Sequence, residues 1–533
     1  MRSTLMVLTF CLWFCACSQP AQASPNVIIF LSDDMGYGDP KCLNPQSRIP
    51  TPNIDLLSRQ GMTFTDAHTS SSICTPSRYG LMTGRYCWRS KLPTGIVWYW
   101  DMPFIDPNRL TMAGMFKQHG YATACVGKWH LGMDWPLDDG SYISDHETAV
   151  LMPPKKREAY SRQIDFRKPI HGGPLAYGFD YYFGTAVPNF PPYCFIENDR
   201  TVGIPALPKP KDMFGRSWGP MIEGWQLEKI LPTMTDKAVA YIDEHAATKK
   251  GQPFFMYFAS TAPHTPIRPD KPFQGKSDAG PYGDLVHQVD WTFGQILRAL
   301  DRNGLADNTI VVFTSDNGSP QRAGDPFLHG SEDFTLGAVK KMYGHNPSYN
   351  YRGMKWNIWD GGHRVPFIVR WPGKVKAGSM CRQTVCLTDW MRTFAGLIGH
   401  PLPKDAGEDS YNIMPLLMGQ TDNPIREATV HHSSMAGPNM AIGNGFAIRQ
   451  GQWKLIHGVG PHGRVKERVK DLPSDHPIGE LYDIQADPGE QNNLWNDRQD
   501  VVERLVALLE KYQREGRSVA VDHKTLKRSV SRR

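Results

Sequence analysis

Four apolar runs along the chain have the length and composition of buried β-strands. They lie at residues 27–31, 121–126, 253–259 and 309–314, and apolar residues dominate each run without a regular alternation with charged ones. Strands that are apolar on both faces are typical of parallel sheets covered by helices. The pattern therefore predicts a large α/β domain with a mainly parallel central sheet.

The pattern changes after about residue 425. Residues 446–456 read as a hairpin of two short strands, residues 481–484 as another strand, and the apolar positions of residues 501–512 recur at helical spacing. These features predict a small C-terminal α+β subdomain. The expected organisation is a signal peptide at 1–23, a catalytic domain at 24–424, the subdomain at 425–515 and a basic, frayed tail at 516–533.

Oxygen-bearing side chains follow two of the predicted strands. Asp33 and Asp34 come directly after the first run, and Asp316 and Asn317 after the last. Adjacent carboxylates repel each other unless a positive group neutralises them, and the carboxyl ends of parallel strands meet at one edge of a sheet. A single such pair is equally typical of a solvated turn. Two pairs with oxygen ligands and no thiolate or imidazole predict a hard cation, calcium before magnesium.

The other two runs also end in groups that titrate. Lys128 and His130 follow the run at 121–126, and His264 follows the run at 253–259. A single histidine is more often a structural residue than a catalyst. Because four strands end in this way, we interpret these side chains as parts of one site.

A further candidate stands at residues 70–85. Thr75 is a suitable N-cap, Pro76 fits the first helical position, and Gly84 is a suitable stop, so Cys74 is expected at the mouth of a short helix. Unpaired N–H groups, the helix dipole and Arg78 would favour an anion there. The alternative is a small buried cysteine beside a structural arginine.

The sequence Cys74-x-Pro-Ser-Arg78 followed by Leu-x-Thr-Gly84 resembles the signature of the formylglycine-dependent (type I) sulfatases. The motifs SDDMGYGD, GKWHLG, APHTP, SDNG and LYDI with DPGE extend the resemblance from residue 25 to about 514. It implies an alkaline-phosphatase-like α/β sandwich with a C-terminal subdomain. It also implies that a formylglycine-generating enzyme oxidises Cys74 to an aldehyde, whose hydrate attacks the sulfur of a sulfate ester.

The resemblance implies roles for the remaining site residues. Arg78, Lys128 and Lys355 would hold the hydrate and the sulfate, although Lys355 taken singly is typical of a surface lysine. Asp316 would help to deprotonate the hydrate, His264 would protonate the departing alcohol, and His130 would take a proton so that sulfate leaves. The implied calcium ligands are Asp33, Asp34, Asp316, Asn317 and an oxygen of the modified Cys74.

The expected substrate is a sulfated carbohydrate, with galactose or N-acetylgalactosamine 6-sulfate as the candidates. Long segments at 134–235 and 319–350 are expected to rim the pocket, which makes His345 a candidate substrate contact. Trp100, in the aromatic cluster of residues 98–100, is a second candidate because aromatic rings can stack on sugar rings. Three alternatives are a phosphomonoesterase or phosphodiesterase of the same fold, a cysteine hydrolase using Cys74 as a thiolate, and a non-catalytic protein that binds sulfated sugars.

Composition and charge indicate the cellular location and exclude one class of partner. The chain has 533 residues and a formal net charge of +6, of which +5 lies in the tail at 516–533, so the body is near neutral and nucleic acid is not the expected partner. Residues 1–23 have a secretory pattern, with Cys17 as an alternative lipoprotein acceptor, and no other apolar run approaches membrane length. These features predict a secreted or periplasmic protein.

The cysteine count agrees with this setting. Seven of the ten cysteines remain after residues 1–23, and an odd number in an exported protein leaves one for chemistry. Cys74 is the candidate. Cys381 and Cys386 are close enough in sequence for a local disulfide.

Overall fold

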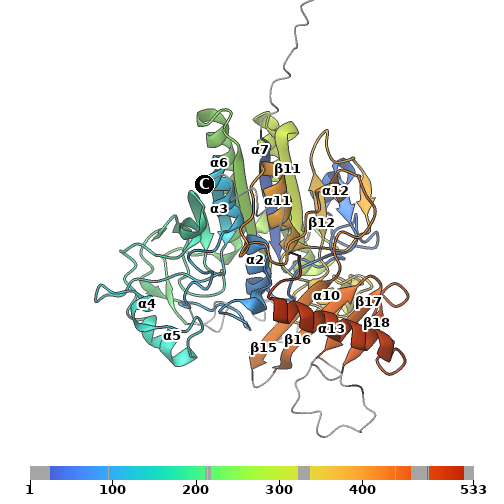
Figure 1. Ribbon diagram of the computed structural model, residues 1–533. Coiled ribbons are helices and arrows are strands. Elements are labelled where there is room, and N and C mark those ends of the chain that lie inside the picture. Colours follow the sequence, from blue (N-terminus) through green and yellow to red (C-terminus); the bar gives the residue numbers. More distant parts are fainter. Residues whose placement is uncertain are drawn as a thin grey trace, which may run out of the picture.

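A ten-stranded sheet forms the centre of the molecule (Figure 1). We describe it from a computed structural model that covers residues 24–93, 95–210, 213, 218–321, 336–437, 440–457, 477 and 479–520. The strands, in spatial order, are β13 (Ser379–Cys381), β2 (Met62–Phe64), β12 (Phe367–Arg370), β11 (Thr309–Ser315), β1 (Asn26–Asp33), β10 (Phe254–Pro263), β4 (Ala122–Lys128), β5 (Tyr181–Thr185), β6 (Ile196–Glu197) and β7 (Arg200–Thr201).

The sheet is mixed but mainly parallel. Strands β11, β1, β10, β4 and β5 run parallel to one another, whereas β12 is antiparallel to both of its neighbours. The predicted α/β class and the mainly parallel sheet are therefore confirmed. Two small two-stranded sheets accompany it, β3 (Ala67–His68) with β14 (Val385–Cys386) and β8 (Leu207–Pro208) with β9 (Pro220–Met221).

Helices cover both faces of the sheet, so the domain is a three-layer sandwich. In β1, Ile28 and Phe30 point into one core with α1, α6 and α7, and Val27, Ile29 and Leu31 point into the other with α2, α3 and α11. The helices are α1 (Pro52–Gln60), α2 (Cys74–Thr83), α3 (Met112–Gln118), α4 (Ile143–His146), α5 (Pro154–Tyr160), α6 (Ile230–Thr248), α7 (Gly280–Arg302), α9 (Leu336–Tyr343), α10 (Asp360–His363), α11 (Trp390–Ile398), α12 (Met414–Leu417) and α13 (Gln499–Glu515).

The parallel register brings the strand ends to one edge. Ser32 of β1 lies opposite Ser315 of β11, Asp33 lies opposite Pro263 of β10, and Ala259 of β10 lies opposite Gly127 of β4. Polar residues that follow these strands in sequence are therefore neighbours in space. This edge is where open parallel sheets place their binding sites.

The C-terminal elements form a second, antiparallel sheet at one end of the molecule, coloured orange and red in Figure 1. Its strands are β15 (Thr429–Gly437), β16 (Met440–Gln450), β17 (Trp453–His457) and β18 (Glu480–Asp483), and α13 packs on it through Val501, Val502, Leu505 and Leu509. The predicted hairpin, strand and amphipathic helix are all present.

The segment 134–235 contributes β5, β6 and β7 to the large sheet, and 319–350 contains helix α9, while residues 322–335 lie outside the described part. Two other expectations were wrong. Cys381 and Cys386 are both free thiols. Residues 516–520 are not frayed, because the N–H groups of Ser518 and Val519 donate to the Glu408 carbonyl. The expected signal peptide at 1–23 and the tail beyond residue 520 lie outside the described residues. Among the residues that the structure describes, no helix is long and apolar enough to cross a membrane.

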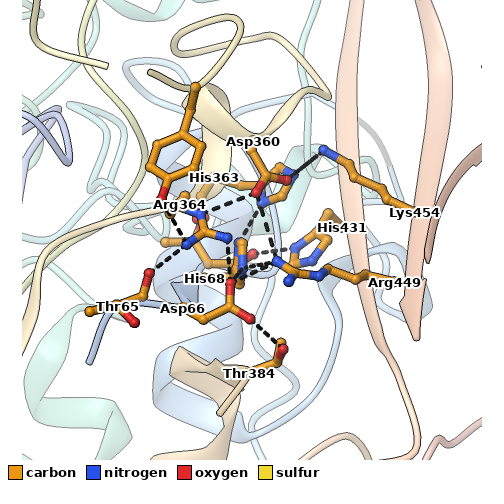
Figure 2. A network of polar contacts seen from close by, with 12 residues as sticks. Thr65, Asp66, His68, Asp360, His363, Arg364, Thr384, His431, Arg449 and Lys454 are labelled. Atoms are coloured by element: carbon orange, nitrogen blue, oxygen red, sulfur yellow. Dashed lines mark hydrogen bonds and ion pairs between the residues drawn. The ribbon is translucent and has the colours of Figure 1, made fainter. Parts of the chain in front are cut away.

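A buried polar network joins the subdomain to the main domain (Figure 2). Asp66, after β2, accepts from Arg449 of β16 at 2.7 Å and pairs with Arg364. Asp360 of α10 accepts from Lys454 of β17 at 2.8 Å and from Arg364 at 3.1 Å. Opposite charges thus alternate across the interface and are shielded from water.

Three buried histidines, His68, His363 and His431, lie inside this network. The Nδ1 atoms of His363 and His68 are hydrogen-bonded to each other (2.9 Å), and His68 Nε2 is hydrogen-bonded to Asp66 (3.0 Å). Lys454 Nζ lies 3.1 Å from His363 Nε2, and Arg449 Nη1 lies 3.1 Å from His68 Nε2. Ligand atoms of the three histidines lie within 4.8 Å of one another. However, the His363 and His431 rings stack 3.8 Å apart at 6°, so a cation in the plane of one ring is out of the plane of the other. We therefore interpret the cluster as a hydrogen-bonded chain rather than a metal site.

The network predicts a large effect of one buried cation on stability. Lys454→Met removes the ammonium that pairs with both Asp360 and Glu490. Two buried carboxylates then lose this partner, and we expect the free energy of unfolding to fall by about 3–5 kcal/mol in chemical denaturation.

Arg162→Ala is the control for this prediction. Its ion pair with Glu158 leaves the two side chains 69% and 65% exposed, and exposed pairs of this kind contribute little. Equal losses of stability in the two variants would contradict the prediction.

Candidate functional site

Side chains from four strand ends converge at the carboxyl edge of the sheet. Lys128, the last residue of β4, donates to both oxygens of Asp33, the last residue of β1, at 2.9 Å. Asp34 accepts from Asn317 at 2.7 Å, its N–H donates to Asp316 at 3.1 Å, and its Oδ2 lies 3.7 Å from Nε2 of His264. The groups predicted from the ends of β1, β4, β10 and β11 are thus brought together.

Two more cations enter this edge from helix α2 and from the segment before α10. Arg78 donates to Asp316 Oδ2 through Nε (3.0 Å) and Nη2 (2.8 Å), and its Nη2 lies 3.2 Å from Asp33. Lys355 donates to both oxygens of Asp34, at 2.7 and 2.8 Å. Three cations therefore face three carboxylates, and all six side chains are buried.

Cys74 is the first residue of α2, and the helix N-cap is Ile73, not Thr75. Thr75 does not cap because its hydroxyl donates to the His130 carbonyl (3.2 Å) and accepts from the Val97 N–H (3.3 Å). Gly84 ends the helix in the left-handed conformation, as expected. Cys74 is only 1% exposed, at a helix N-terminus that faces the cations.

Burial has the largest effect on the pKa of the Cys74 thiol. It raises the pKa of Cys74, and the nearby charges of Lys128 and Lys355 lower that pKa only in part. His130 and His264 each use one ring nitrogen for a bond to the backbone and not to the Cys74 thiol. His130 Nε2 donates to the Val97 carbonyl, and His264 Nδ1 donates to the Thr265 carbonyl. Within the described residues no histidine is hydrogen-bonded to this thiol, which argues against a cysteine hydrolase with a Cys–His pair.

The carboxylates differ in their affinity for protons. Burial tends to raise the pKa of Asp33, but the charges of Lys128, His264 and Arg78 outweigh it and hold that pKa well below its usual value. For Asp316 burial dominates over the attraction of Arg78 and raises the pKa to about 7. Their surroundings thus shift the pKa values of these two buried carboxyl groups in opposite directions.

Hydrogen bonds leave one nitrogen free on each histidine of the site. His130 donates from Nε2, so its buried Nδ1 keeps a lone pair without a partner. His264 donates from Nδ1 and keeps Nε2 free toward Asp34. Burial lowers the pKa of His130 well below its usual value and that of His264 to about 4, in both cases with a contribution from neighbouring lysines.

The donor set fits a hard cation. Asp33 and Asp34 offer carboxylate oxygens that lie with His264 Nε2 within 4.8 Å of one another, and Asp316 reaches the same place. Asn317 Oδ1 is buried without a hydrogen-bond partner. A buried carbonyl oxygen with no donor costs free energy unless a positive group contacts it, so Asn317 points to a cation held by oxygens.

Two predicted substrate contacts were wrong. Trp100 is 1% exposed, packs edge-on against Trp135 at 4.9 Å and donates from Nε1 to Ser161, so it is a core residue. His345 is fully buried and donates to Asp39 at 2.8 Å. The polar atoms of both side chains form hydrogen bonds inside the fold, and neither side chain is exposed to solvent.

One aromatic neighbour of the site had no predicted role. Trp356, directly after Lys355, packs against the buried cluster of Ile73, Cys74 and Ile96, as does Trp98. The indoles of Trp98 and Trp356 are both half-buried. The sequence signal for Trp356 was its position beside a candidate lysine in a glycine-bearing segment.

Comparisons with known proteins agree with this geometry. A family model described as Sulfatase matches residues 25–400, and one described as N-sulphoglucosamine sulphohydrolase, C-terminal, matches residues 353–515. The chain is 35% identical over 525 residues to an N-acetylgalactosamine-6-O-sulfatase of Bacteroides thetaiotaomicron, covering 91% of this chain and 92% of that protein. It is 30% identical over 538 residues to human steryl-sulfatase, covering 92% and 87%. A solved structure from work on the metabolism of multiple glycosaminoglycans by Bacteroides thetaiotaomicron has a TM-score of 0.73 and 31% identity, covering 92% of this chain and 99% of that one.

The close approach of strands next to Lys128 predicts a strict requirement for glycine. A Cβ on Gly127, whose φ is +120°, would lie 1.8 Å from the Ala259 carbonyl oxygen of β10. Gly127→Ala must therefore push β4 away from β10 and displace Lys128. We expect it to lower the free energy of unfolding by more than about 3 kcal/mol, or to prevent folding.

Gly120→Ala is the matched control. Gly120 also has a positive φ, +78°, but nothing lies within 4 Å of a Cβ there, so only the left-handed backbone contributes, about 1 kcal/mol. Thermal unfolding of the two variants checks the difference, and a Gly127→Ala protein as stable as Gly120→Ala would contradict it.

Proposed function

Because the chain belongs to the sulfatase family and is a sulfuric ester hydrolase, we propose that it removes sulfate from sulfated carbohydrates, with galactose or N-acetylgalactosamine 6-sulfate as the substrate. The observation that carries the chemistry is the convergence of Arg78, Lys128 and Lys355 on the edge where Cys74 lies. Fixed cations stabilise the negative charge that spreads over the sulfate oxygens in the transition state. The choice of a 6-sulfated sugar rests on the relative named N-acetylgalactosamine-6-O-sulfatase.

We propose calcium as the metal. Sulfatases generally use a metal ion and a formylglycine, and here Asp33, Asp34, Asp316 and Asn317 would hold the ion together with an oxygen at position 74. The support is a ligand set that offers carboxylate and amide oxygens and an unpaired Asn317 oxygen. When bound, calcium supplies positive charge to the sulfate oxygens and to the nucleophile.

The nucleophile requires a change of Cys74. In our proposal a sulfatase-maturing enzyme oxidises the thiol to an aldehyde, and the hydrate of the aldehyde supplies the oxygen that attacks sulfur. Asp316 takes the proton from this oxygen, and Arg78, which is hydrogen-bonded to Asp316, keeps the carboxylate aimed. Lys128 and Lys355 bind the sulfate oxygens. The formation of the new S–O bond breaks the bond between sulfur and the alcohol oxygen.

The histidines divide the remaining proton transfers. His264 Nε2 protonates the departing alcohol, and the bound anionic sulfate ester favours the protonated form of this ring. His130 Nδ1, with its free lone pair, takes the proton of the second hydroxyl at position 74. The carbonyl then re-forms as the C–O bond to sulfate breaks, and sulfate leaves without attack of water on sulfur.

A phosphomonoesterase or phosphodiesterase of the same fold is the second candidate. Such an enzyme usually has a hydroxyl nucleophile and several histidine ligands, whereas the ligands proposed here are three carboxylates and one asparagine, with the imidazole of His264 beside them. A non-catalytic sugar-binding protein would not need the free nitrogens of His130 and His264.

For the cellular location, we propose export to the periplasm or beyond, supported by the secretory pattern of residues 1–23.

Turnover of defined sulfated sugars tests the function. We expect the protein, co-expressed with a sulfatase-maturing enzyme, to release sulfate from galactose or N-acetylgalactosamine 6-sulfate and not phosphate from the matching 6-phosphates. Cys74→Ser should lose multiple turnover, because a serine has no second hydroxyl to expel sulfate. Its sulfated form, heavier by about 80 Da, should accumulate in mass spectra.

Cys42→Ser is the control, since Cys42 is a half-exposed cysteine outside the site, and it should keep full activity. Full multiple turnover by Cys74→Ser would refute the proposed nucleophile. A Cys74 peptide at the thiol mass, rather than about 18 Da lower, in an active preparation would do the same.

Calcium binding has a readout other than activity. We expect Ca²⁺ to raise the thermal midpoint of chelator-treated protein, because a ligand that binds only the folded state stabilises it by about 2.7 kcal/mol at a hundred times its Kd. Asn317→Ala removes one oxygen ligand and should weaken Ca²⁺ by about tenfold or more.

The control here is Asp500→Asn, which removes an exposed carboxylate remote from the sheet edge. It should leave the Ca²⁺ response unchanged. A larger shift with Mg²⁺ than with Ca²⁺ would refute the choice of metal, and an unchanged response of Asn317→Ala would refute the ligand.

A further inference from the structure

We propose that Trp356 is the residue on which the sugar ring of the substrate stacks, so that it positions the ring while the sulfate is held by the cations. The inference rests on the proposed function, because it assumes that the alcohol is a sugar. The preceding residue in the chain, Lys355, is already bound to Asp34 in the site. Trp356 is thus placed at the border between the charged hollow and the exterior.

The surroundings of the indole favour a surface for a ligand rather than a core residue. Trp356 packs against the cluster that contains Cys74, yet it remains partly exposed, whereas Cys74 is 1% exposed. The Lys355 ammonium lies 5.8 Å from the centre of its ring. The Trp356 indole is therefore partly accessible to solvent beside Cys74 and Lys355.

The backbone at Trp356 is held in an unusual conformation. Its φ is +76°, in the left-handed region that residues other than glycine rarely adopt. Its N–H donates to the Ser72 carbonyl at 3.0 Å, and its carbonyl accepts from the Ser433 hydroxyl of β15. Strained residues persist where the surroundings fix them on both sides, and such residues concentrate at functional sites.

These contacts fix the indole relative to the nucleophile. Ser72 lies two residues before Cys74, and its own N–H donates to the His432 carbonyl, next to Ser433. One short segment of β15 therefore anchors both the residues before Cys74 and the peptide of Trp356. Two backbone hydrogen bonds and the Ser433 hydroxyl therefore fix the backbone of Trp356 relative to the segment that leads into Cys74.

The chemistry of a 6-sulfated pyranose suits this arrangement. The sulfate is joined to the ring through a methylene group, so the ring lies outside the hollow when the sulfate is inside. One face of galactose-type rings presents C–H groups, which bury favourably on an indole. Stacking of this kind acts on the bound substrate and the transition state alike, and its loss raises KM with little change in kcat.

Kinetics of two substitutions test the proposal. Trp356→Leu keeps an apolar side chain but removes the flat face, and Trp356→Phe restores a smaller one. With galactose or N-acetylgalactosamine 6-sulfate we expect KM to rise about tenfold in Trp356→Leu and about twofold in Trp356→Phe, with kcat within about twofold of the parent. The inhibition constant of inorganic sulfate, which fills only the hollow, should not change.

Trp453 provides the matched control. It is also half-buried and also lies near a cation, the Arg498 guanidinium at 4.7 Å, but it belongs to β17. Trp453→Leu should leave KM unchanged. An unchanged KM in Trp356→Leu would overturn the stacking role, and so would an equal weakening of inorganic sulfate, which would indicate a purely structural residue. If the parent protein released sulfate from no sugar, the proposed function would fail, and this inference with it.

Discussion

The pairing of three cations with three carboxylates, out of contact with water, is the interaction on which the site depends. Separately, each of these charges would be costly to bury, and together they satisfy one another over distances of about 3 Å. The arrangement is close to neutral without any ligand. An added divalent cation and an added sulfate monoester bring opposite charges, so both find complementary groups already in place.

The parallel sheet makes this pairing possible. Adjacent strands that run in the same direction end at the same level, and the residues that follow them share a small volume. Gly127 lets β4 approach β10 closely enough for Lys128 to reach Asp33. The helices contribute less to the chemistry, except α2, whose first residue is Cys74 and whose Arg78 crosses to Asp316.

The C-terminal subdomain is part of the site although it supplies none of the titrating groups there. The backbone of His432 in β15 is hydrogen-bonded to the backbone of Ser70 and Ser72, shortly before Cys74, and the neighbouring Ser433 donates to the Trp356 carbonyl. The buried network of Asp66, Asp360 and Lys454 fixes the two parts against each other (Figure 2). Because these ion pairs are inaccessible to water, they oppose separation of the subdomain from the sheet edge.

Much of the fold and most of the site followed from the sequence. Continuous apolar runs that end in Asp33, Lys128, His264 and Asp316 specify both the strands and their common edge, since strand direction and side-chain chemistry are local properties. The residues that each of these side chains contacts could not be predicted in the same way, because they come from other segments of the chain. Trp100 and His345 have the residue types of sugar contacts, and only the packing of distant segments, Trp135 on one and Asp39 on the other, buried them. Thr75 has the residue type of a helix N-cap, but its hydroxyl is hydrogen-bonded to the backbone of His130 and Val97 instead. Sequence therefore determined which groups are available and at which strand ends they lie, whereas the tertiary structure decided which of them remain open to a ligand, because burial and pairing depend on contacts between segments that are not adjacent in the chain.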